Sequence, residues 1–388
     1  MKTNKLIMLF GVLVALTSCS STSTNSKTNY SKSSSYNYNY YSNSKFSSSS
    51  SSKSTKKLYT YTDSTKTSLY FGSYPQTLVT SSSMIKSLNS KAGTLPTESN
   101  SYNWTNYVYK TYDCSLEGMF FIDIDYDNDG AYDYRGVHIL SYRKTVYNES
   151  YDGQCQLNNG YNLNHTYWFR YDPIEWKILK TSNNSALILS DLILDSQPYY
   201  EYTTTRGCGN SLDVDYQGNI TDSATITYPN NYKFSEIRNW LNMGSGSLYN
   251  KAMMRNNFGA FNEKEYEIIK ETKVDNSSSS TWINYGSSIN PYACEDTNDK
   301  IFLLSYKEMN TYFDSDTSRL AQGTEYAKSQ GLSVMDEYEG SPYLQRSPYA
   351  YIYNSSDDSC VVNNDGSLKK CTVNFTCNGV RPACWINL

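Results

Sequence analysis

The sequence predicts a strand-rich α+β fold for residues 58–388, and three observations favour it. Short runs rich in Tyr, Thr and Ile recur in this region and are bounded by Asn, Ser and Gly, the usual signal for strands and turns. Helical spacing of apolar residues appears in separate short segments, so helices are inserted singly among strands, as in the α+β class. The 40 Tyr residues can supply the large apolar areas of a core, although the hydrophobic fraction is 38%.

Composition argues against two classes of protein. The chain of 388 residues has 34 Lys and Arg residues and 38 Asp and Glu residues, which argues against a strongly cationic nucleic-acid-binding protein. With 2 His residues, a His-rich metalloenzyme is not indicated either. His138 and His165 show no Ser-His-Asp or Cys-His arrangement in the sequence, and we expect surface or packed side chains.

The first 18 residues have the features of a secretion signal. Two Lys residues precede an apolar run over 6–16, which is too short to span a bilayer as a stable helix. The tetrapeptide LTSC at 16–19 resembles the lipobox of bacterial lipoproteins, in which the Cys is diacylated and becomes the first residue after cleavage. Residues 1–18 are therefore predicted to be a lipoprotein signal peptide, and Cys19 the lipidated residue, carrying acyl chains such as palmitate on the extracytoplasmic face of the cell membrane. The alternative is an ordinary cleaved signal peptide with an incidental Cys.

Residues 19–57 are predicted to be a disordered tether. This segment is nearly all Ser, Thr, Asn, Tyr and Lys and cannot bury enough apolar surface to offset the cost of ordering. It is basic, whereas residues 58–388 have a net negative charge. A basic tether below an acidic body suits an anionic membrane or wall polymer; alternatively, the Lys residues keep the segment soluble.

The body, residues 58–388, is predicted to begin with short strands and turns over 58–141. Within it, the acidic stretch 120–134 predicts a hairpin whose tip lies at 128–130. Three further predicted strands occupy residues 167–180, 186–190 and 301–305. The size of the body is compatible with one large domain or with two closely packed halves, 58–166 and 167–388.

Three segments have helical spacing. Residues 235–242 predict a helix capped by Ser235, with Ile237, Trp240 and Leu241 on one face. A capped acidic helix is predicted over 262–271, with Tyr266 and Ile269 facing inward. A short helix over 324–330 is predicted to end at Gly331.

The cysteine content indicates an oxidising compartment. Apart from Cys19 the chain has an even number of Cys residues, which favours disulfides in an exported protein. Reactive thiols stay open as an alternative, whereas zinc would need paired CxxC spacing that the sequence lacks. The disulfide candidates are Cys114, Cys155, Cys208, Cys294, Cys360, Cys371, Cys377 and Cys384.

The predicted hairpin also carries the pattern of a calcium loop. Asp125, Asp127, Asp129 and Asp133 fit positions 1, 3, 5 and 9, and Gly130 fits position 6, where the chain must turn sharply. Position 12 is a Gly where calcium loops carry a bidentate Glu. We expect no cofactor and an acidic hairpin tip without a metal, and calcium held by these carboxylates is the alternative that the pattern leaves open.

Two Arg and three Trp residues are further site candidates. Arg346 and Arg381 lie in apolar surroundings near the C-terminus, so each must be paired if it is buried, either as a structural fork or as a clamp on an anionic ligand. Trp176, Trp240 and Trp385 could line a sugar pocket, although Trp at strand or helix spacing is more often core.

Several ordered segments together resemble the signature segments of a bacterial surface domain of unknown function. The resemblance covers residues 68–388, nearly the whole body, and implies extracytoplasmic display without implying an activity. The segments are GSYPQT at 72–77, PIEWKIL at 173–179, LDSQ at 194–197, RNWLN at 238–242, DKIFLLS at 299–305, RSP at 346–348 and GVRPACWINL at 379–388.

The C-terminal half is also similar to the formylglycine-generating-enzyme and C-type-lectin-like fold. The pairing of RSP at 346–348 with GVRPA at 379–383 resembles the closing strands of that fold. Relatives of the surface domain carry Trp-Trp-Leu before RSP, whereas this chain has YLQ at 343–345, so an aromatic platform is not expected there. The residues around Cys360, Cys371 and Cys377 do not match the copper-binding thiols of the enzyme, and no catalytic residue is carried over.

Taken together, these features predict a lipid-anchored surface protein that binds a glycan, a wall polymer or another surface protein without catalysis. The alternatives are an oxidoreductase that uses two thiols, with copper, and a purely structural component of the envelope.

Overall fold

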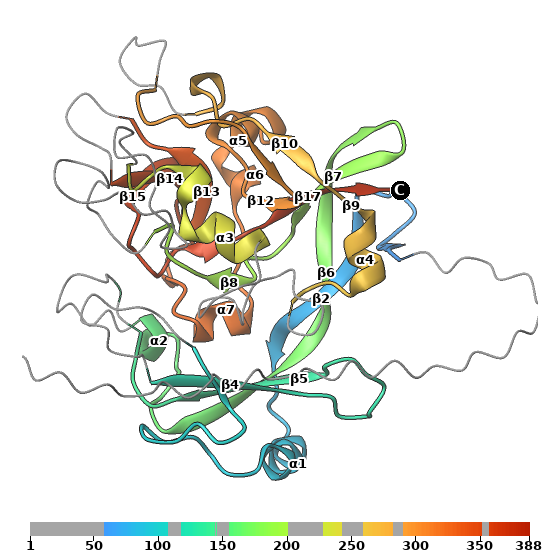
Figure 1. Ribbon diagram of the computed structural model, residues 1–388, viewed down its shortest axis with the longest axis vertical. Coiled ribbons are helices and arrows are strands. Elements are labelled where there is room, and N and C mark those ends of the chain that lie inside the picture. Colours follow the sequence, from blue (N-terminus) through green and yellow to red (C-terminus); the bar gives the residue numbers. More distant parts are fainter. Residues whose placement is uncertain are drawn as a thin grey trace, which may run out of the picture. The chain divides into compact units, whose positions relative to one another are not determined.

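The computed structural model describes residues 58–107, 118–143, 145, 155–200, 228–242, 259–281, 290–350 and 357–388 (Figure 1). The chain divides between Ser54 and Thr55 into two units, and every described residue belongs to the second. The predicted signal peptide, Cys19 and the predicted tether lie outside the described residues. Within the described part, no helix is long and apolar enough to cross a membrane.

The fold is a strand-rich α+β structure, as predicted. Its largest sheet has ten strands in the order β12-β17-β7-β6-β5-β4-β3, with β2 beside β6, β1 beside β2 and β9 beside β17. The bounds are β1 Thr60–Tyr61, β2 Ser68–Leu78, β3 Thr105–Asn106, β4 Met119–Ile124, β5 Tyr134–Ile139, β6 His165–Ser182, β7 Ser185–Ser190, β9 Ile269–Lys270, β12 Ile301–Phe302 and β17 Ala383–Asn387.

A five-stranded sheet and a two-stranded sheet complete the strands. The five-stranded sheet has the order β15-β14-β13-β16-β8, and β13 and β16 are parallel. Its bounds are β8 Asp195–Ser196, β13 Tyr343–Pro348, β14 Asp358–Val362, β15 Leu368–Thr372 and β16 Gly379–Val380; the two-stranded sheet pairs β10 Thr272–Val274 with β11 Thr297–Asp299.

The 18-residue strand β6 is the common neighbour of three strands. It pairs with β5 over its first part, with β2 along its middle and with β7 over its last part. In Figure 1, β2 and β6 run side by side through the molecule. Segments before and after residue 166 therefore share one sheet.

The helices are short and surround these sheets. Figure 1 shows α1 beside β4, α4 beside β9, and α7 near β8. Their bounds are α1 Ser82–Ala92, α2 Cys155–Asn158, α3 Glu236–Asn242, α4 Glu263–Ile268, α5 Tyr306–Tyr312, α6 Asp316–Arg319 and α7 Glu325–Ser329, with 3-10 turns at Tyr232–Phe234 and Ser278–Ser280.

The hairpin and two of the predicted helices, whose turn residues and caps are visible in the sequence, form as predicted. The predicted hairpin is formed by β4 and β5, and Asn128 and Gly130 at its tip have φ of 62° and 95°. The helix α3 buries Ile237, Trp240 and Leu241, and the Ser235 hydroxyl accepts a hydrogen bond of 3.2 Å from the backbone N–H at residue 238. The helix α7 is capped by Thr324 and followed by Gly331 with φ of 96°.

Two predicted elements end earlier than expected. The helix predicted over 262–271 ends at Ile268, because Ile269 and Lys270 form β9 and pair with Trp385 and Ile386 of β17. The strand predicted over 301–305 is paired at Ile301 and Phe302 only, and Ser305 already caps α5. The first boundary is set by pairing with the distant strand β17, and the second by the cap at Ser305 that begins α5.

The sequence patterns did not predict α1, α2, α5 and α6. In α1, the buried residues are Leu88 and Ala92, so its apolar face is too small to show helical spacing. In α5 and α6, the start signals are the capping boxes at Ser305 and Ser315, which stand among many other Ser residues.

The core contains a buried ion pair between the two strands of the hairpin. Asp123 in β4 lies opposite Arg135 in β5, and Nε and Nη2 of the guanidinium donate to Oδ1 and Oδ2 of Asp123 over 2.7 and 2.8 Å. Both side chains are almost fully buried. Tyr171 donates its hydroxyl to Asp123 over 3.0 Å, and Arg135 Nη1 donates to the hydroxyl of Tyr326 in α7 over 3.2 Å. The pair thus connects β6 and α7 with the hairpin.

We expect Arg135→Met to destabilise the protein by about 3–5 kcal/mol, because it leaves the carboxylate of Asp123 buried and uncompensated. The matched control is Arg170→Met, which removes a pair with Asp172 in which the Arg side chain is 56% exposed, and which should cost about 0–1 kcal/mol. Urea unfolding of both variants of the whole chain measures the difference. Equal midpoints would contradict the role assigned to the buried pair.

Candidate functional site

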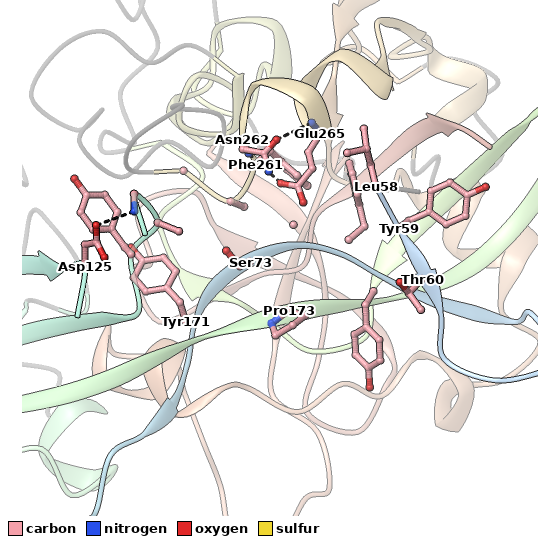
Figure 2. Close-up of a pocket in the computed structure, with 18 residues that line it drawn as sticks. Leu58, Tyr59, Thr60, Ser73, Asp125, Tyr171, Pro173, Phe261, Asn262 and Glu265 are labelled. Carbon is pink, nitrogen blue, oxygen red and sulfur yellow. Dashed lines mark hydrogen bonds between the residues drawn. The ribbon is translucent and has the colours of Figure 1, made fainter. Parts of the chain in front are cut away.

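One cavity in the described part of the chain has a volume of about 800 Å³. Five stretches of the sequence line it: residues 58–60, residues 70–73, the tip of the β4–β5 hairpin, residues 171 and 173 of β6, and residues 259–265. Figure 2 shows Asp125 and Tyr171 on one side of this pocket, Leu58, Tyr59 and Thr60 on the other, and Asn262 and Glu265 at the start of α4. We call this cavity the aromatic pocket, because Tyr59, Tyr70, Phe71, Tyr132, Tyr171 and Phe261 line it.

Stacked rings form the inner part of the aromatic pocket. Phe71 and Phe261 pack with ring centroids 5.0 Å apart, and Trp176 stacks on Phe261 at 6.2 Å. Trp176 is fully buried and donates its indole N–H to the Phe71 carbonyl over 2.7 Å. Trp176 therefore packs against Phe261 and holds the backbone of Phe71, and it does not itself line the cavity.

Gly72 allows the two walls to meet. Its φ is 68°, and a Cβ atom at this position would lie 2.5 Å from the Ala260 carbonyl oxygen. Next to it, the backbone N–H of Ser73 donates to that same carbonyl over 2.8 Å. A residue with a side chain would therefore push residues 259–261 away from β2.

The Tyr residues at the hairpin end connect the pocket to the buried ion pair. Tyr132 packs against Tyr171 with centroids 6.3 Å apart, and the Tyr171 hydroxyl donates to Asp123. Burial raises the pKa of Tyr171, so its hydroxyl keeps its proton as a donor. Tyr171 is held in one orientation by this bond.

Two carboxylates line the pocket, and its described lining contains no Lys, Arg or His. Glu265 accepts a hydrogen bond of 3.0 Å from the backbone N–H of Asn262 in the capping box of α4. Burial raises the pKa of Glu265, because water is partly excluded from its carboxylate. Asp125 accepts a 2.9 Å bond from the Gly130 N–H. The pocket therefore combines apolar rings with acceptor oxygens.

The acidic hairpin tip brings together three of the four predicted calcium ligands. Carboxylate oxygens of Asp125, Asp127 and Asp133 lie within 4.8 Å of one another. Asp129 is not part of this group, and its carboxylate accepts a 2.9 Å bond from the Ala131 N–H. At position 12, a Cβ atom on Gly136 would lie 2.8 Å from the Trp168 ring, so no bidentate Glu fits there. Calcium stays the open alternative for this loop.

Arg346 and Arg381 are buried and bonded to the backbone. Arg346 donates to the Leu303 carbonyl over 2.8 Å and pairs with Glu308, and Arg381 donates to the Ser190 carbonyl over 2.9 Å. Neither lines the aromatic pocket. The other two predicted Trp residues lie elsewhere too: Trp240 is buried in α3, and Trp385 lies partly buried in β17.

The two His residues are held in local contacts. His138 Nδ1 lies 2.8 Å from the Thr166 hydroxyl, and burial lowers the pKa of His138. His165 packs its ring against Tyr167 at 4.5 Å. Both lie outside the lining of the aromatic pocket.

No disulfide bond joins the described cysteines. The free cysteines are Cys155, Cys294, Cys360, Cys371, Cys377 and Cys384. Cys114 and Cys208 lie outside the described residues, so the framework of four disulfides stays a prediction. One contact stands out: the sulfur atoms of Cys155 and Cys377 are 2.8 Å apart.

The sequence did not indicate most of the pocket residues. Tyr132, Tyr171, Phe261 and Glu265 were not among its site candidates, whereas Asp125 was. The GSYPQT segment contains Gly72, and an isolated Gly inside a strand pattern is a signal of close backbone approach that could have pointed to this wall. The remaining residues meet only in three dimensions.

We expect calcium, if the hairpin tip binds it, to bind weakly, in the range of extracellular sites at about 10⁻⁴–10⁻³ M. Isothermal titration of the whole chain with Ca²⁺ measures this. Asp127→Asn should abolish the heat, whereas Glu98→Gln, an exposed position outside the loop, should leave it unchanged. No calcium-dependent heat in the parent chain would show that the tip is an acidic turn without a metal.

Comparison with known proteins assigns a family and no activity. The model of a domain of unknown function, DUF6273, matches residues 183–388, more than half of the chain. The segments LDSQ, RNWLN, DKIFLLS, RSP and GVRPACWINL lie in the matched region, whereas GSYPQT and PIEWKIL precede it. No curated protein and no solved structure matches the chain. On the strength of the family match, this chain belongs to the DUF6273 family of proteins with a domain of unknown function.

Proposed function

We propose that this chain is a lipid-anchored, extracytoplasmic protein that binds a glycan, a wall polymer or another surface protein without catalysing a reaction. The observation that carries the proposal is the aromatic pocket, a cavity of about 800 Å³ lined by six aromatic residues and a few polar groups. Binding sites for small ligands are typically concave and largely apolar, with few placed polar groups, and their volumes run from about 300 to 1,000 Å³.

The chemistry of the lining suits a saccharide. Aromatic rings provide flat apolar surfaces for the C–H faces of a sugar ring, and the oxygens of Ser73, Asp125, Asn262 and Glu265 can bond hydroxyl groups. Tyr contributes contact area at low entropic cost, because it has few rotatable bonds. Tyr70, which lines the pocket and is 41% exposed, extends this surface towards solvent.

The charge of the lining favours an amine-bearing ligand over an anionic one. Asp125 and Glu265 are negative, and the described lining offers no cation to balance them. An ammonium group could contact a carboxylate and an aromatic face together, and both contacts strengthen where water is excluded. Amino sugars and partly deacetylated wall polymers have this chemistry.

One observation bears on the alternative of a thiol oxidoreductase with copper. Cys155 and Cys377 lie together, but their sulfurs are 2.8 Å apart. Two thiolates that share a tetrahedral metal at about 2.3 Å each lie about 3.8 Å apart. The spacing therefore does not fit a metal held between these sulfurs, and we derive no step through copper. A structural envelope component is the third alternative, and ligand binding distinguishes it from our proposal.

We expect Tyr132→Ala to weaken ligand binding about tenfold, or about 1.4 kcal/mol, because it removes one aromatic wall of the pocket. The probes are chitin and chitosan oligosaccharides of equal length, which differ in their amine groups, measured by titration of the whole chain. The matched control is Tyr102→Ala, since Tyr102 is 51% exposed and does not line the pocket. Equal losses in both variants would contradict the pocket assignment, and no binding across a broad glycan panel would remove the glycan version.

Chitosan should bind more tightly than chitin once its amines are protonated, and its affinity should fall as the pH drops further, through the pKa of Glu265. Burial raises the pKa of Glu265, so protons neutralise this carboxylate as the pH falls through that raised pKa, and the attraction for an ammonium group is lost. Glu265→Gln should remove the part of this fall that arises from Glu265, while chitin binding changes little. An unchanged pH profile would exclude Glu265 as the charged contact.

The lipid anchor is tested separately. Cys19→Ala should move the protein from the membrane fraction to the soluble fraction of cells, because it removes the residue that carries the acyl chains. Cys294→Ala is the control and should leave the protein in the membrane fraction. Retention of the Cys19→Ala protein in the membrane would contradict anchoring through this residue.

A further inference from the structure

We propose that Cys155 and Cys377 form a disulfide bond that fastens α2 to the C-terminal part of the family domain. Cys155 is the first residue of α2, and Cys377 precedes β16, 222 residues later. Their sulfurs are 2.8 Å apart, whereas non-bonded carbon atoms, which are smaller than sulfur, are separated by about 3.5–4.0 Å. This inference is independent of the ligand proposed above and rests on the proposed extracytoplasmic location, where the thiols meet an oxidant.

Hydrogen bonds connect the residues around both cysteines to the same third segment, residues 328–333. Beside Cys155, the side-chain amide of Asn159 donates to the carbonyls of Lys328 and Leu332 over 2.9 and 2.8 Å. On the other side, the Ser333 N–H donates to the Cys377 carbonyl over 2.9 Å. Residues 328–333 thus hold both cysteines in place, and bond formation requires little movement.

The same junction is held by further buried contacts. Gln156 donates to the Ser329 carbonyl over 2.6 Å, and the Ser196 hydroxyl donates to the Thr376 carbonyl over 2.8 Å. The disulfide would therefore link three parts that already pack together: α2, the end of α7 and the strand β8 with its neighbours. The disulfide would close a loop of 222 residues, and a cross-link across a long loop lowers the entropy of the unfolded chain more than one across a short loop.

The two thiols differ in a way that sets the order of oxidation. Cys155 is partly exposed, and its hydrogen bond with Cys377 lowers the pKa of Cys155, whereas Cys377 is almost fully buried and its pKa is raised by the same bond and by burial. Cys155 is accordingly the thiolate that an oxidant reaches first.

The oxidant is a disulfide, either a small molecule or a thiol oxidoreductase of the extracytoplasmic space. The Cys155 thiolate attacks one sulfur of this disulfide, a mixed disulfide forms, and one oxidant sulfur leaves with the electron pair and takes up a proton. Cys377 then loses its proton to water, its sulfur attacks the sulfur of Cys155, and the second oxidant thiol departs. In total, two protein thiols are oxidised to one disulfide while the oxidant disulfide is reduced to two thiols.

Peptide mapping tests the bond without any variant. The whole chain is exported, solubilised in detergent, denatured without reductant, alkylated and digested, and its peptides are weighed before and after reduction. We expect a cross-linked pair that contains Cys155 and Cys377, that is lost on reduction and that yields both peptides. Alkylation of both residues in the unreduced chain would overturn the proposal, as would a cross-link from either of them to another cysteine.

Two variants give an independent readout. Cys155→Ser should free one additional thiol, at Cys377, and Cys377→Ser should free the thiol of Cys155. The control is Cys384→Ser, which changes a buried cysteine in β17 and should leave the cross-link between residues 155 and 377 intact. If a variant fails to fold, mapping of the parent chain still decides the question.

Discussion

The buried pair of Arg135 and Asp123 is the constraint on which the other parts of the structure depend. An Arg side chain cannot lose its charge in a protein, so a buried Arg needs an acidic partner and acceptors for its N–H groups. Here the acceptors are Asp123 on the opposite strand of the hairpin and the Tyr326 hydroxyl in α7. Tyr171 of β6 donates a further hydrogen bond to Asp123. One charged pair thereby fixes the hairpin register, the position of α7 on the sheet and the orientation of a tyrosine in the pocket wall.

Sequence reasoning succeeded where the determining contacts are local. The class of the fold, the β4–β5 hairpin and the helices α3 and α7 follow from spacing, caps and turn residues within a few positions. It failed where a distant partner decides the structure: Ile269 leaves its helix to pair with β17, and the pocket assembles from segments spread over residues 58–265. Gly72 illustrates the difference, since its place in a motif is visible in the sequence, but its reason, the approach of Ala260, is not.

The aromatic pocket is built across the boundary of the family match. Its wall at residues 259–265 lies inside the matched region, whereas β2 and the hairpin tip precede residue 183. The strand β6 joins these parts in one sheet and ends at the point where the match begins. Proteins that share the matched region and have a different segment before it would therefore keep the five-stranded sheet and its buried Arg residues and present a different cavity.

The position of residues 58–60 also has a mechanical consequence. These residues form one wall of the pocket, and they run into β1, which is paired to β2 at two positions, Thr60 with Tyr70 and Tyr61 with Leu69. A pulling force on the chain before residue 58 would load this short pairing first, while the long β2–β6 ladder behind it stays closed. Tension would thus open the cavity before it unfolds the body, and occupancy of the cavity would in turn resist the pull.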